Sequence, residues 1–587
     1  MKHSGEKGGA RSLRIDPSEY LAVVLLLFTL WALHVFFIQR LNFTGDEIRY
    51  VSYGLGVCEG EGFYASGKTW NAFLETFPSW GVQKESPSLA KGGLIHSVVY
   101  PLIGALAIHH FQLDGARWVS FGVGCLGMGI LFFALRRRFP ATAVLGAMAA
   151  ILFSCPLLFY FRLFFSEIML FCVNCLLLYL LTLGECRSAK RLYGMSAFLF
   201  VFPFLHLKMS LEAAVAFCVL LLEFRRNGGK TRPQIVAVLM GVVFFLFYLL
   251  YNKHFFGHYI GGASAAFPVT PLAIPGRIII NLFDYHHGII ANAPLMLLGF
   301  IGLLSGVFQK DAFIRKISVI FGAYFFTMLW ANGSESYAAR NWAAAMPFLA
   351  AGFAAWVKES GFSKRLMALP FLALSLCLTM LALKSPNLFL DNRTYALQYD
   401  ALFSFIPYFH FGYYLPYDFL DHAGTDLYGS LPLGVPIFAV LALFAAGQLL
   451  SGKRLLRGAA CQLLALLIIF FFSFVEEYKD VSVSIGQDGR MRYVNVKLEE
   501  PRSLAFVKIA NPAAMLKLYG FLNYWTLEDG EWDSVMRPAS VLLTENPFHC
   551  VDAILISETP DETQPQWLDT AVRAQVFTRR LSLFSCP

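Results

Sequence analysis

Charge is what this sequence has least of. Only 15% of its 587 residues are charged, against about a quarter in a typical soluble domain, while 57% are hydrophobic and 58 are phenylalanine. The sequence contains no Walker loop, no dinucleotide fingerprint, no metal-finger spacing and no internal repeat of about 20–50 residues. The net charge of +8 comes from short, dispersed basic clusters, so this composition does not indicate a nucleic-acid-binding protein.

Cysteine is also sparse, with 11 residues in the whole chain. Most of them lie within or at the ends of apolar runs, where packing is their simplest role. Cys58 stands alone in the first loop, and Cys550 and Cys586 fall in the C-terminal tail. The last two are a candidate disulfide, and the sequence leaves open whether they pair.

Long apolar runs are abundant. Runs of roughly 17–22 residues recur over the first 475 positions, and this length crosses a hydrocarbon core about 30 Å thick. They predict an all-α polytopic membrane protein with about 13 transmembrane helices. The first run is too long for a signal-peptide core and is expected to stay as an anchor. The predicted spans are 18–38, 115–135, 142–158, 165–184, 192–206, 209–223, 233–252, 291–308, 317–331, 342–357, 366–384, 431–450 and 457–475.

Basic clusters orient these spans through the positive-inside rule. Placing the clusters in the cytoplasm puts the N-terminus inside and the C-terminus outside. The segment 96–111 is apolar enough to be a further span, but counting it would move Arg136–Arg138 outside. A helix lying on or dipping into the outer face is therefore favoured, with a true crossing as the alternative. The clusters lie at 2–14, 136–138, 187–191, 225–232, 310–316, 358–365 and 453–457.

Two domains are expected. Residues 1–475 form the transmembrane domain, with its first extracytoplasmic loop at 39–114. Residues 476–587 change character, because short strand-like runs replace the long apolar ones and Gly486–Gly489 is a turn signal. They predict a small, mostly-β C-terminal extracytoplasmic domain. Its predicted strands are 481–485, 492–498, 503–509, 540–543 and 553–557.

Polar chemistry is concentrated directly after the first span. Thr44 and Glu47 have capping-box spacing, and a helix of about 45–55 would place Asp46, Arg49 and Tyr50 on one face. The cap gives Glu47 a structural interpretation beside a functional one. Asp46 is not used by the cap and is a candidate general base for a hydroxyl proton. The alternative for Asp46 is a carboxylate favoured by the helix N-terminus or by Arg49.

The motif Asp46-Glu47-x-Arg49-Tyr50 after the first span resembles the acidic motif of integral-membrane GT-C glycosyltransferases. The nearest groups are the bacterial lipid A aminoarabinose transferases and the protein O-mannosyltransferase-like enzymes. Four further segments are similar to that family's elements in the same order. The resemblance covers roughly residues 18–475, and the tail is not clearly covered. The segments are Gly92–Leu106, Phe159–Glu167, Asn281–Ile290 and Trp330–Pro347.

This resemblance implies a GT-C fold and an inverting glycosyl transfer on the extracytoplasmic face. The donor would be a sugar on a polyprenyl phosphate that enters from the bilayer, and the acceptor a lipid, glycan or protein. Asp46, with Glu47 beside it, would be the catalytic carboxylate. No cofactor is required, and dependence on a divalent metal stays open because family members differ. The expected location is multi-pass in a membrane, most simply the bacterial inner membrane.

Arg340 is the first candidate for the donor phosphate. A guanidinium matches phosphate bidentately, and a lone charge at the outer end of a span is costly unless it has a role. The alternative is an arginine that snorkels to the interface. Further candidates are His96, as a phosphate donor or metal ligand, and Lys91, displaced from the family's usual basic position. Arg49 and Tyr50 complete this candidate set.

Two other groups are candidates on the same face. Arg162 and Glu167 flank a turn of the second hairpin, and pairing with each other is their alternative role. Asp284, His286 and His287 precede the 291–308 span. Such residues bind zinc in other proteins, but a clear spacing and a third ligand are missing, so the sequence identifies no metal.

A transporter or lipid flippase is the alternative class of function. It would need ionisable residues near mid-membrane and an internal repeat. Glu212 stands near the outer end of its span and Lys208 precedes it, and the other polar residues also gather at one face. This distribution favours an enzyme with a one-sided active site. A scaffold or receptor that uses the tail as a binding module is the third class.

Overall fold

The structure is a computed structural model, and it divides into two compact units that are described separately. The helical unit comprises residues 1–270 and 292–387, and the second unit comprises residues 271–291 and 388–587. The structure describes residues 15–36, 41, 46–63, 65–75, 97–257, 259, 274–284, 287–308, 311–329, 339–366, 368–384, 389, 460, 463–464, 475–479, 481–488, 491–510, 521–528, 531–538, 541–543, 550–558 and 573–579.

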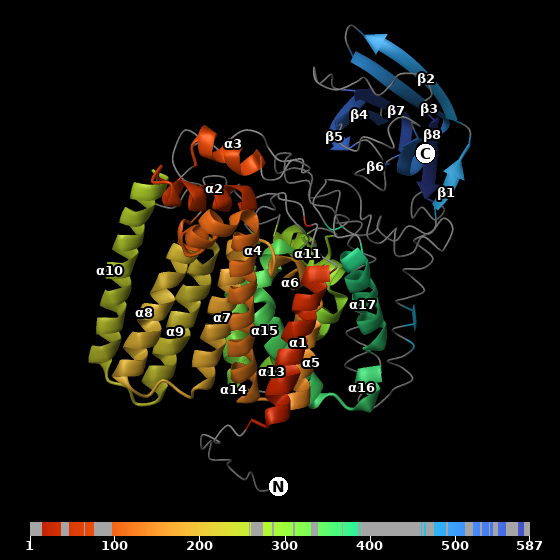
Figure 1. Cartoon of the computed structure of the whole chain (residues 1–587). Helices are drawn as coiled ribbons and strands as arrows, with labels where there is room; N and C mark the ends of the chain where they lie inside the picture. The colour runs from red at the N-terminus through yellow and green to blue at the C-terminus, as the bar shows by residue number, and fades with distance from the viewer. Residues whose placement is uncertain are drawn as a thin grey trace. The chain divides into compact units, whose positions relative to one another are not determined.

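Helices account for the regular structure of the described part of the helical unit (Figure 1). The long helices run side by side, and α4 packs against α7, α8 against α10, and α13 against α15. The helices are α1 (Pro17–Phe36), α2 (Asp46–Cys58), α3 (Gly67–Glu75), α4 (Val99–Arg136), α5 (Ala141–Leu152), α6 (Leu157–Tyr160), α7 (Ser166–Thr182), α8 (Ala189–Leu205), η1 (Leu207–Met209), α9 (Ser210–Arg226), α10 (Thr231–Phe256), η3 (Pro294–Met296), α13 (Leu297–Phe308), α14 (Ala312–Met328), η4 (Arg340–Ala345), α15 (Met346–Glu359), α16 (Phe362–Leu366) and α17 (Leu369–Lys384).

Four helical stretches of the described part are long and apolar enough to cross a membrane. They are Pro17–Phe36, Val99–Arg136, Thr231–Phe256 and Lys364–Lys384, and shorter apolar helices lie between them. Most apolar side chains of Thr231–Phe256 are exposed, and they lie on nearly all sides of the helix, as expected where lipid surrounds it. The chain is a polytopic, helical integral membrane protein. The full number of crossings stays a prediction, because the spans 431–450 and 457–475 lie outside the described residues.

Two predicted spans are interrupted, and each break lies at a proline. The span predicted at 142–158 is divided into α5 and α6, with Pro156 directly before α6. The span predicted at 291–308 contains the end of α12 (Ile289–Asn292), the 3-10 turn η3 that begins at Pro294, and α13. Proline lacks the backbone donor that a helix interior needs, so each span is assembled from a short turn and a helix.

The first loop is more helical than expected. Helix α2 begins at Asp46 and ends at Cys58, and the additional helix α3 follows it. The predicted outer-face helix 96–111 and the span 115–135 belong to one stretch, α4, which is kinked at Gln112 (φ 55°, ψ −141°). Gly54 lets α2 approach the first part of α4, since a Cβ there would lie 2.5 Å from Ile108 Cδ1.

Ion pairs brace the end of the helices where α9 finishes and α14 begins. Glu19 of α1 accepts hydrogen bonds from Arg136 of α4, at 2.5 and 2.8 Å. Glu223 of α9 accepts a hydrogen bond of 2.5 Å from Lys316 of α14. These four residues belong to or adjoin the basic clusters predicted for the cytoplasmic side. The starts of α7, α9 and α15 lie away from these pairs, at the other end of α9.

The second unit contains α11 (Ile274–Phe283) and the described strands of the tail. The strands form an antiparallel sheet in the order β1-β8-β3-β7-β4-β5, with β2 and β6 also paired to β3. That the tail is a separate extracytoplasmic domain stays a prediction. The strands are β1 (Val475–Tyr478), β2 (Val481–Asp488), β3 (Met491–Ala510), β4 (Phe521–Glu528), β5 (Glu531–Pro538), β6 (Val541–Leu543), β7 (Cys550–Glu558) and β8 (Arg573–Arg579).

Candidate active site

Helix α2 begins with two carboxylates that have different partners. Glu47 is fully buried and forms a bidentate pair with Arg117 of α4, at 3.0 and 2.9 Å. Its Oε1 also accepts a hydrogen bond of 2.9 Å from the backbone N–H of Phe164, in the segment that leads into α7. Glu47 therefore joins three parts of the chain, and its side chain holds α2 in place. Thr44, the predicted capping partner, lies outside the described residues.

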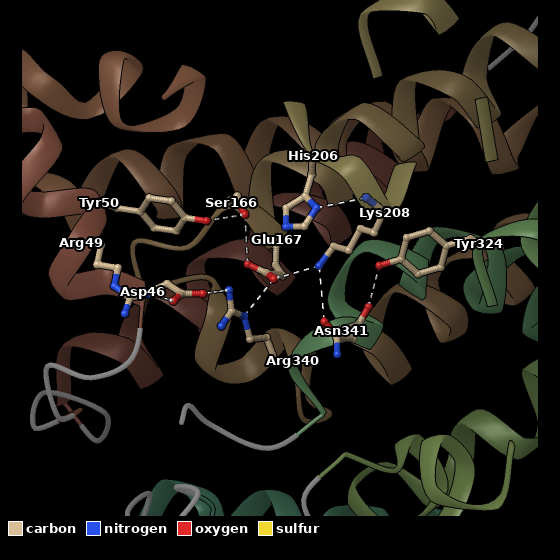
Figure 2. Close-up of polar contacts among 10 residues, drawn as sticks. All are labelled: Asp46, Arg49, Tyr50, Ser166, Glu167, His206, Lys208, Tyr324, Arg340 and Asn341. Carbon is tan, nitrogen blue, oxygen red and sulfur yellow. Dashed lines mark hydrogen bonds and ion pairs between the residues drawn. The ribbon is translucent and has the colours of Figure 1, made fainter. Parts of the chain in front are cut away.

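Asp46 belongs to a different network, which is drawn in Figure 2. Its Oδ2 forms an ion pair with Nη2 of Arg340, a residue far away in the sequence. The Nε of the same guanidinium donates to Glu167 Oε1 at 2.9 Å, and Lys208 Nζ donates to that oxygen at 2.9 Å. All four side chains are buried. We call these four residues the charge cluster.

Helix starts surround the charge cluster. Asp46 opens α2, and Glu167 is in the first turn of α7. Lys208 lies in η1 immediately before α9, and Arg340 opens η4 immediately before α15. A helix N-terminus carries partial positive charge and unpaired N–H groups, which favour carboxylates and other anions. The sequence thus places two acidic residues where the helix dipoles stabilise them, and brings two cations to the same place.

The cluster also sets the charge state of its basic members. Burial lowers the pKa of the Arg340 guanidinium, but the Asp46 and Glu167 carboxylates outweigh it and the pKa lies well above the ordinary value. Burial lowers the pKa of the Lys208 ammonium, and the Glu167 carboxylate only partly opposes this. Arg340 is therefore a permanent cation, whereas Lys208 depends on Glu167 to keep its proton.

Aromatic rings and hydroxyls hold this arrangement in register. The guanidinium carbon of Arg340 lies 4.6 Å from the centroid of the Phe165 ring, which fixes the plane of the guanidinium. The Tyr50 hydroxyl is 3.0 Å from Ser166 Oγ, and Ser166 donates to Glu167 Oε2 at 3.3 Å. Burial, and then the Asp46 carboxylate, raise the pKa of the Tyr50 phenol well above its usual value, so this residue stays a neutral hydroxyl.

Hydrogen bonds from buried side chains hold the backbone of η4, which carries Arg340. The chain enters η4 through Ala339, which has a left-handed conformation (φ 56°) that is costly for a residue with a side chain. The Tyr324 hydroxyl donates to the carbonyl of Asn341 at 2.8 Å, and the Asn174 amide donates to that of Ala344 at 2.9 Å. Lys208 Nζ lies 3.5 Å from the Asn341 side-chain oxygen (Figure 2).

The other residues singled out in the sequence lie elsewhere or outside the described part. Arg162 does not pair with Glu167; it donates to the His34 carbonyl at 2.7 Å and lies 3.9 Å from Asp114. Arg49, half-exposed, lies 3.7 Å from Asp46 Oδ1. Asp284 is in the second unit, where it accepts a hydrogen bond of 2.5 Å from the His287 backbone. His96, Lys91 and His286 lie outside the described residues.

A metal site does not emerge from the described residues, because no three His, Cys, Asp or Glu side chains among them gather as metal ligands do. The cations beside Asp46 and Glu167 take up much of the charge that would attract a divalent ion. Dependence on a metal stays open, since His96 and His286, two of the sequence candidates, are not among the residues described.

Three contributors to this site were not assigned to it from the sequence. Lys208 was noticed only as a charge before a span, although the argument used for Arg340 applies to it equally. Arg117 gave no signal, because an arginine within a long apolar run has no partner that spacing reveals. Tyr324 lies inside a predicted span, and a tyrosine there is indistinguishable in sequence from a packing residue.

Comparison with known proteins gives structural matches but no match by sequence. No protein-family model matches the chain, and no curated protein matches it. The structure is similar to the crystal structure of ArnT from Cupriavidus metallidurans bound to undecaprenyl phosphate, with a TM-score of 0.40 and 13% sequence identity. The match covers 78% of this chain and 76% of that chain. What the site can do chemically follows from its own side chains.

Proposed function

We propose that this protein is an integral-membrane glycosyltransferase. It moves a sugar from a polyprenyl-phosphate-linked donor to an acceptor hydroxyl or phosphate of a lipid, glycan or protein, on the extracytoplasmic face and with inversion. In this proposal Asp46 is the general base, Arg340 binds the donor phosphate, and Glu167 and Lys208 hold Arg340 in position. Glu47 acts through Arg117, as the residue that positions α2.

The observation that carries the proposal is the contact between Asp46 and Arg340 within the charge cluster. A glycosyl transfer of this kind needs a carboxylate for the acceptor proton and a cation for the departing phosphate, one on each side of the reacting carbon. Asp46 and Arg340 are in direct contact here, so in this proposal their ion pair opens when the sugar binds between them. Residues that are distant in sequence meet here in a buried setting, where charge interactions are weakly screened. The starts of α2, α7 and α9, where Asp46, Glu167 and Lys208 lie, add dipoles that favour a phosphate.

The reaction then follows from the roles of these groups. The acceptor oxygen loses its proton to Asp46 and forms a bond to the anomeric carbon of the donor sugar. The bond between that carbon and the phosphate oxygen breaks on the opposite face, and the polyprenyl phosphate leaves with the electron pair. Arg340 stabilises the charge that develops on the leaving phosphate, which is the charge that grows in the transition state.

The role of Asp46 as the general base is tested by substitution of this residue in the full-length protein. Membranes containing the protein are given radiolabelled polyprenyl-phosphate sugars and extracted envelope acceptors, and labelled product and released polyprenyl phosphate are measured. Asp46→Asn is expected to lower the transfer rate by about 10³-fold, since it removes the base but keeps the side-chain shape. Transfer at the wild-type rate would exclude Asp46 as the base.

The matched control is Glu185→Gln, which removes an exposed carboxylate paired with Arg187. It should leave the transfer rate within about twofold, because Glu185 does not touch the charge cluster. A transporter or lipid flippase is told apart in the same experiment. It would move a lipid-linked sugar across the membrane, but would release no sugar-free polyprenyl phosphate.

A further inference from the structure

The Arg340 guanidinium is paired with carboxylates of the chain itself. Its Nε donates to Glu167 Oε1 at 2.9 Å, and its Nη2 forms the ion pair with Asp46 Oδ2. A phosphate uses the same kind of guanidinium donors, in the same planar, charge-assisted manner. The Asp46 carboxylate thus takes up a donor of Arg340 that a phosphate group would also use.

The charges of the four buried residues of the cluster balance, and the half-exposed Arg49 adds a positive charge beside Asp46. Arg340 and Lys208 contribute two positive charges, and Asp46 and Glu167 contribute two negative ones. A phosphate added to this set would leave an excess of buried negative charge, and like charges repel strongly where water is excluded. One of the two carboxylates therefore has to move away from Arg340 when a phosphate binds.

Asp46 is the carboxylate that is placed to move. Glu167 is held by Lys208, by Arg340 and by the Ser166 hydroxyl, and only 1% of its side chain is exposed. Asp46 already lies between two arginines, with Oδ1 3.7 Å from Nη1 of Arg49. Arg49 is one turn further along α2 and its side chain is 41% exposed, so it can take the whole charge near solvent.

We infer that Asp46 is an internal competitor for the donor phosphate, which displaces it from Arg340 onto Arg49. The inference rests on the proposed function and adds an order of events to it. Asp46 is therefore released from the buried guanidinium only when the donor phosphate is in place.

A binding experiment without turnover tests this. The dissociation constant of farnesyl phosphate for purified full-length protein in detergent is measured, with farnesol as the uncharged control. Asp46→Asn removes the competing charge, so it should tighten farnesyl phosphate binding by about tenfold or more and leave farnesol binding unchanged. Unchanged or weaker binding of farnesyl phosphate to a variant that unfolds at the wild-type temperature would overturn the inference.

The role of Arg49 is tested by a double-mutant cycle. Arg49→Gln alone should weaken farnesyl phosphate binding several-fold, because the displaced carboxylate loses its new partner. The double variant Asp46→Asn/Arg49→Gln should bind farnesyl phosphate as tightly as Asp46→Asn alone, because residue 46 then carries no carboxylate for Arg49 to pair with. An equal weakening by Arg49→Gln in both backgrounds would mean that Arg49 binds the phosphate directly. It would overturn the inference that the Asp46 carboxylate moves from Arg340 to Arg49.

Arg340→Gln separates failure of this inference from failure of the proposed function. The variant should lose farnesyl phosphate binding while keeping farnesol binding. Unchanged farnesyl phosphate binding would remove Arg340 from the donor site, and the proposed function would fall with it. Lost binding in Arg340→Gln together with unchanged binding in Asp46→Asn would leave the donor site standing and overturn only the competition.

Discussion

Asp46 and Glu47 are neighbours in sequence, yet they belong to two regions with different physical design. Around Glu47 the charges are closed: both carboxylate oxygens are used by Arg117, and the Phe164 N–H adds a third bond. Around Asp46 the charges are shared, because Arg340 divides its donors between two carboxylates and Asp46 lies between two arginines. A closed pair holds a structure together, whereas a shared one can exchange partners with a ligand.

The largest effect is expected from opening the closed pair. Arg117→Met leaves the Glu47 carboxylate buried without its partner, and loss of one member of a buried pair costs about 3–5 kcal/mol. The variant should unfold at a clearly lower temperature in detergent, as followed by intrinsic fluorescence. The double variant Glu47→Gln/Arg117→Met should recover much of that loss. A normal unfolding temperature for Arg117→Met would show that the pair does not anchor α2.

Within the charge cluster, Lys208 is expected to matter next. Lys208→Met removes one of two cations from Glu167, and Arg340 is then drawn towards that carboxylate. We expect kcat/KM for the lipid-linked donor to fall by about 10²-fold. Lys208→Arg is the matched control and should retain most of the activity, because it keeps the charge. Equal loss in both variants would point to a packing role for Lys208 instead of an electrostatic one.

A smaller effect is expected where the backbone of η4 is held. Tyr324→Phe removes only the hydroxyl that donates to the Asn341 carbonyl. Loss of one buried hydrogen bond costs about 1 kcal/mol, so KM for the donor should rise several-fold while kcat changes less. The measurement is steady-state transfer with varied donor. A lower unfolding temperature with unchanged KM would make Tyr324 a purely structural residue.

The smallest effect is expected at the far end of the helices. Glu19→Gln breaks the pair with Arg136, which is partly exposed, and such pairs contribute about 1 kcal/mol or less. Transfer kinetics should stay within about twofold of wild type, and the unfolding temperature should fall by only a few degrees. A change in donor KM would show that this end of the bundle is coupled to the charge cluster.

The first loop shows how far the sequence leads and where it stops. Asp46 and Arg340 were found because each is a charge at a place where charge is expensive, next to a long apolar run. The same reasoning could have found Lys208. The capping-box spacing separated Asp46 from Glu47, but it could not show that Glu47 pairs with Arg117, which is distant in the sequence.

The spacing of charged residues along the sequence could not show which of them form ion pairs in the structure. Arg162 and Glu167 are close in sequence and opposite in charge, but the turn between them points them at different partners. The breaks in the spans follow from Pro156 and Pro294. Both prolines lie inside long apolar runs, and each run was therefore predicted as one uninterrupted span. Hydropathy reports how much of a segment is apolar and not where its helix stops.

The sequence alone determined that this chain lives in a membrane, because backbone groups in lipid must be paired within helices and the apolar runs have the length this requires. It also predicted that the candidate site residues gather at one membrane face, opposite the basic clusters. Only the tertiary structure decided that Glu47 pairs with Arg117 and Asp46 with Arg340. It also decided that Lys208 pairs with Glu167 in the same cluster. Such contacts depend on which helix starts pack together, and that choice is made by side-chain packing across the whole unit rather than by local order in the chain.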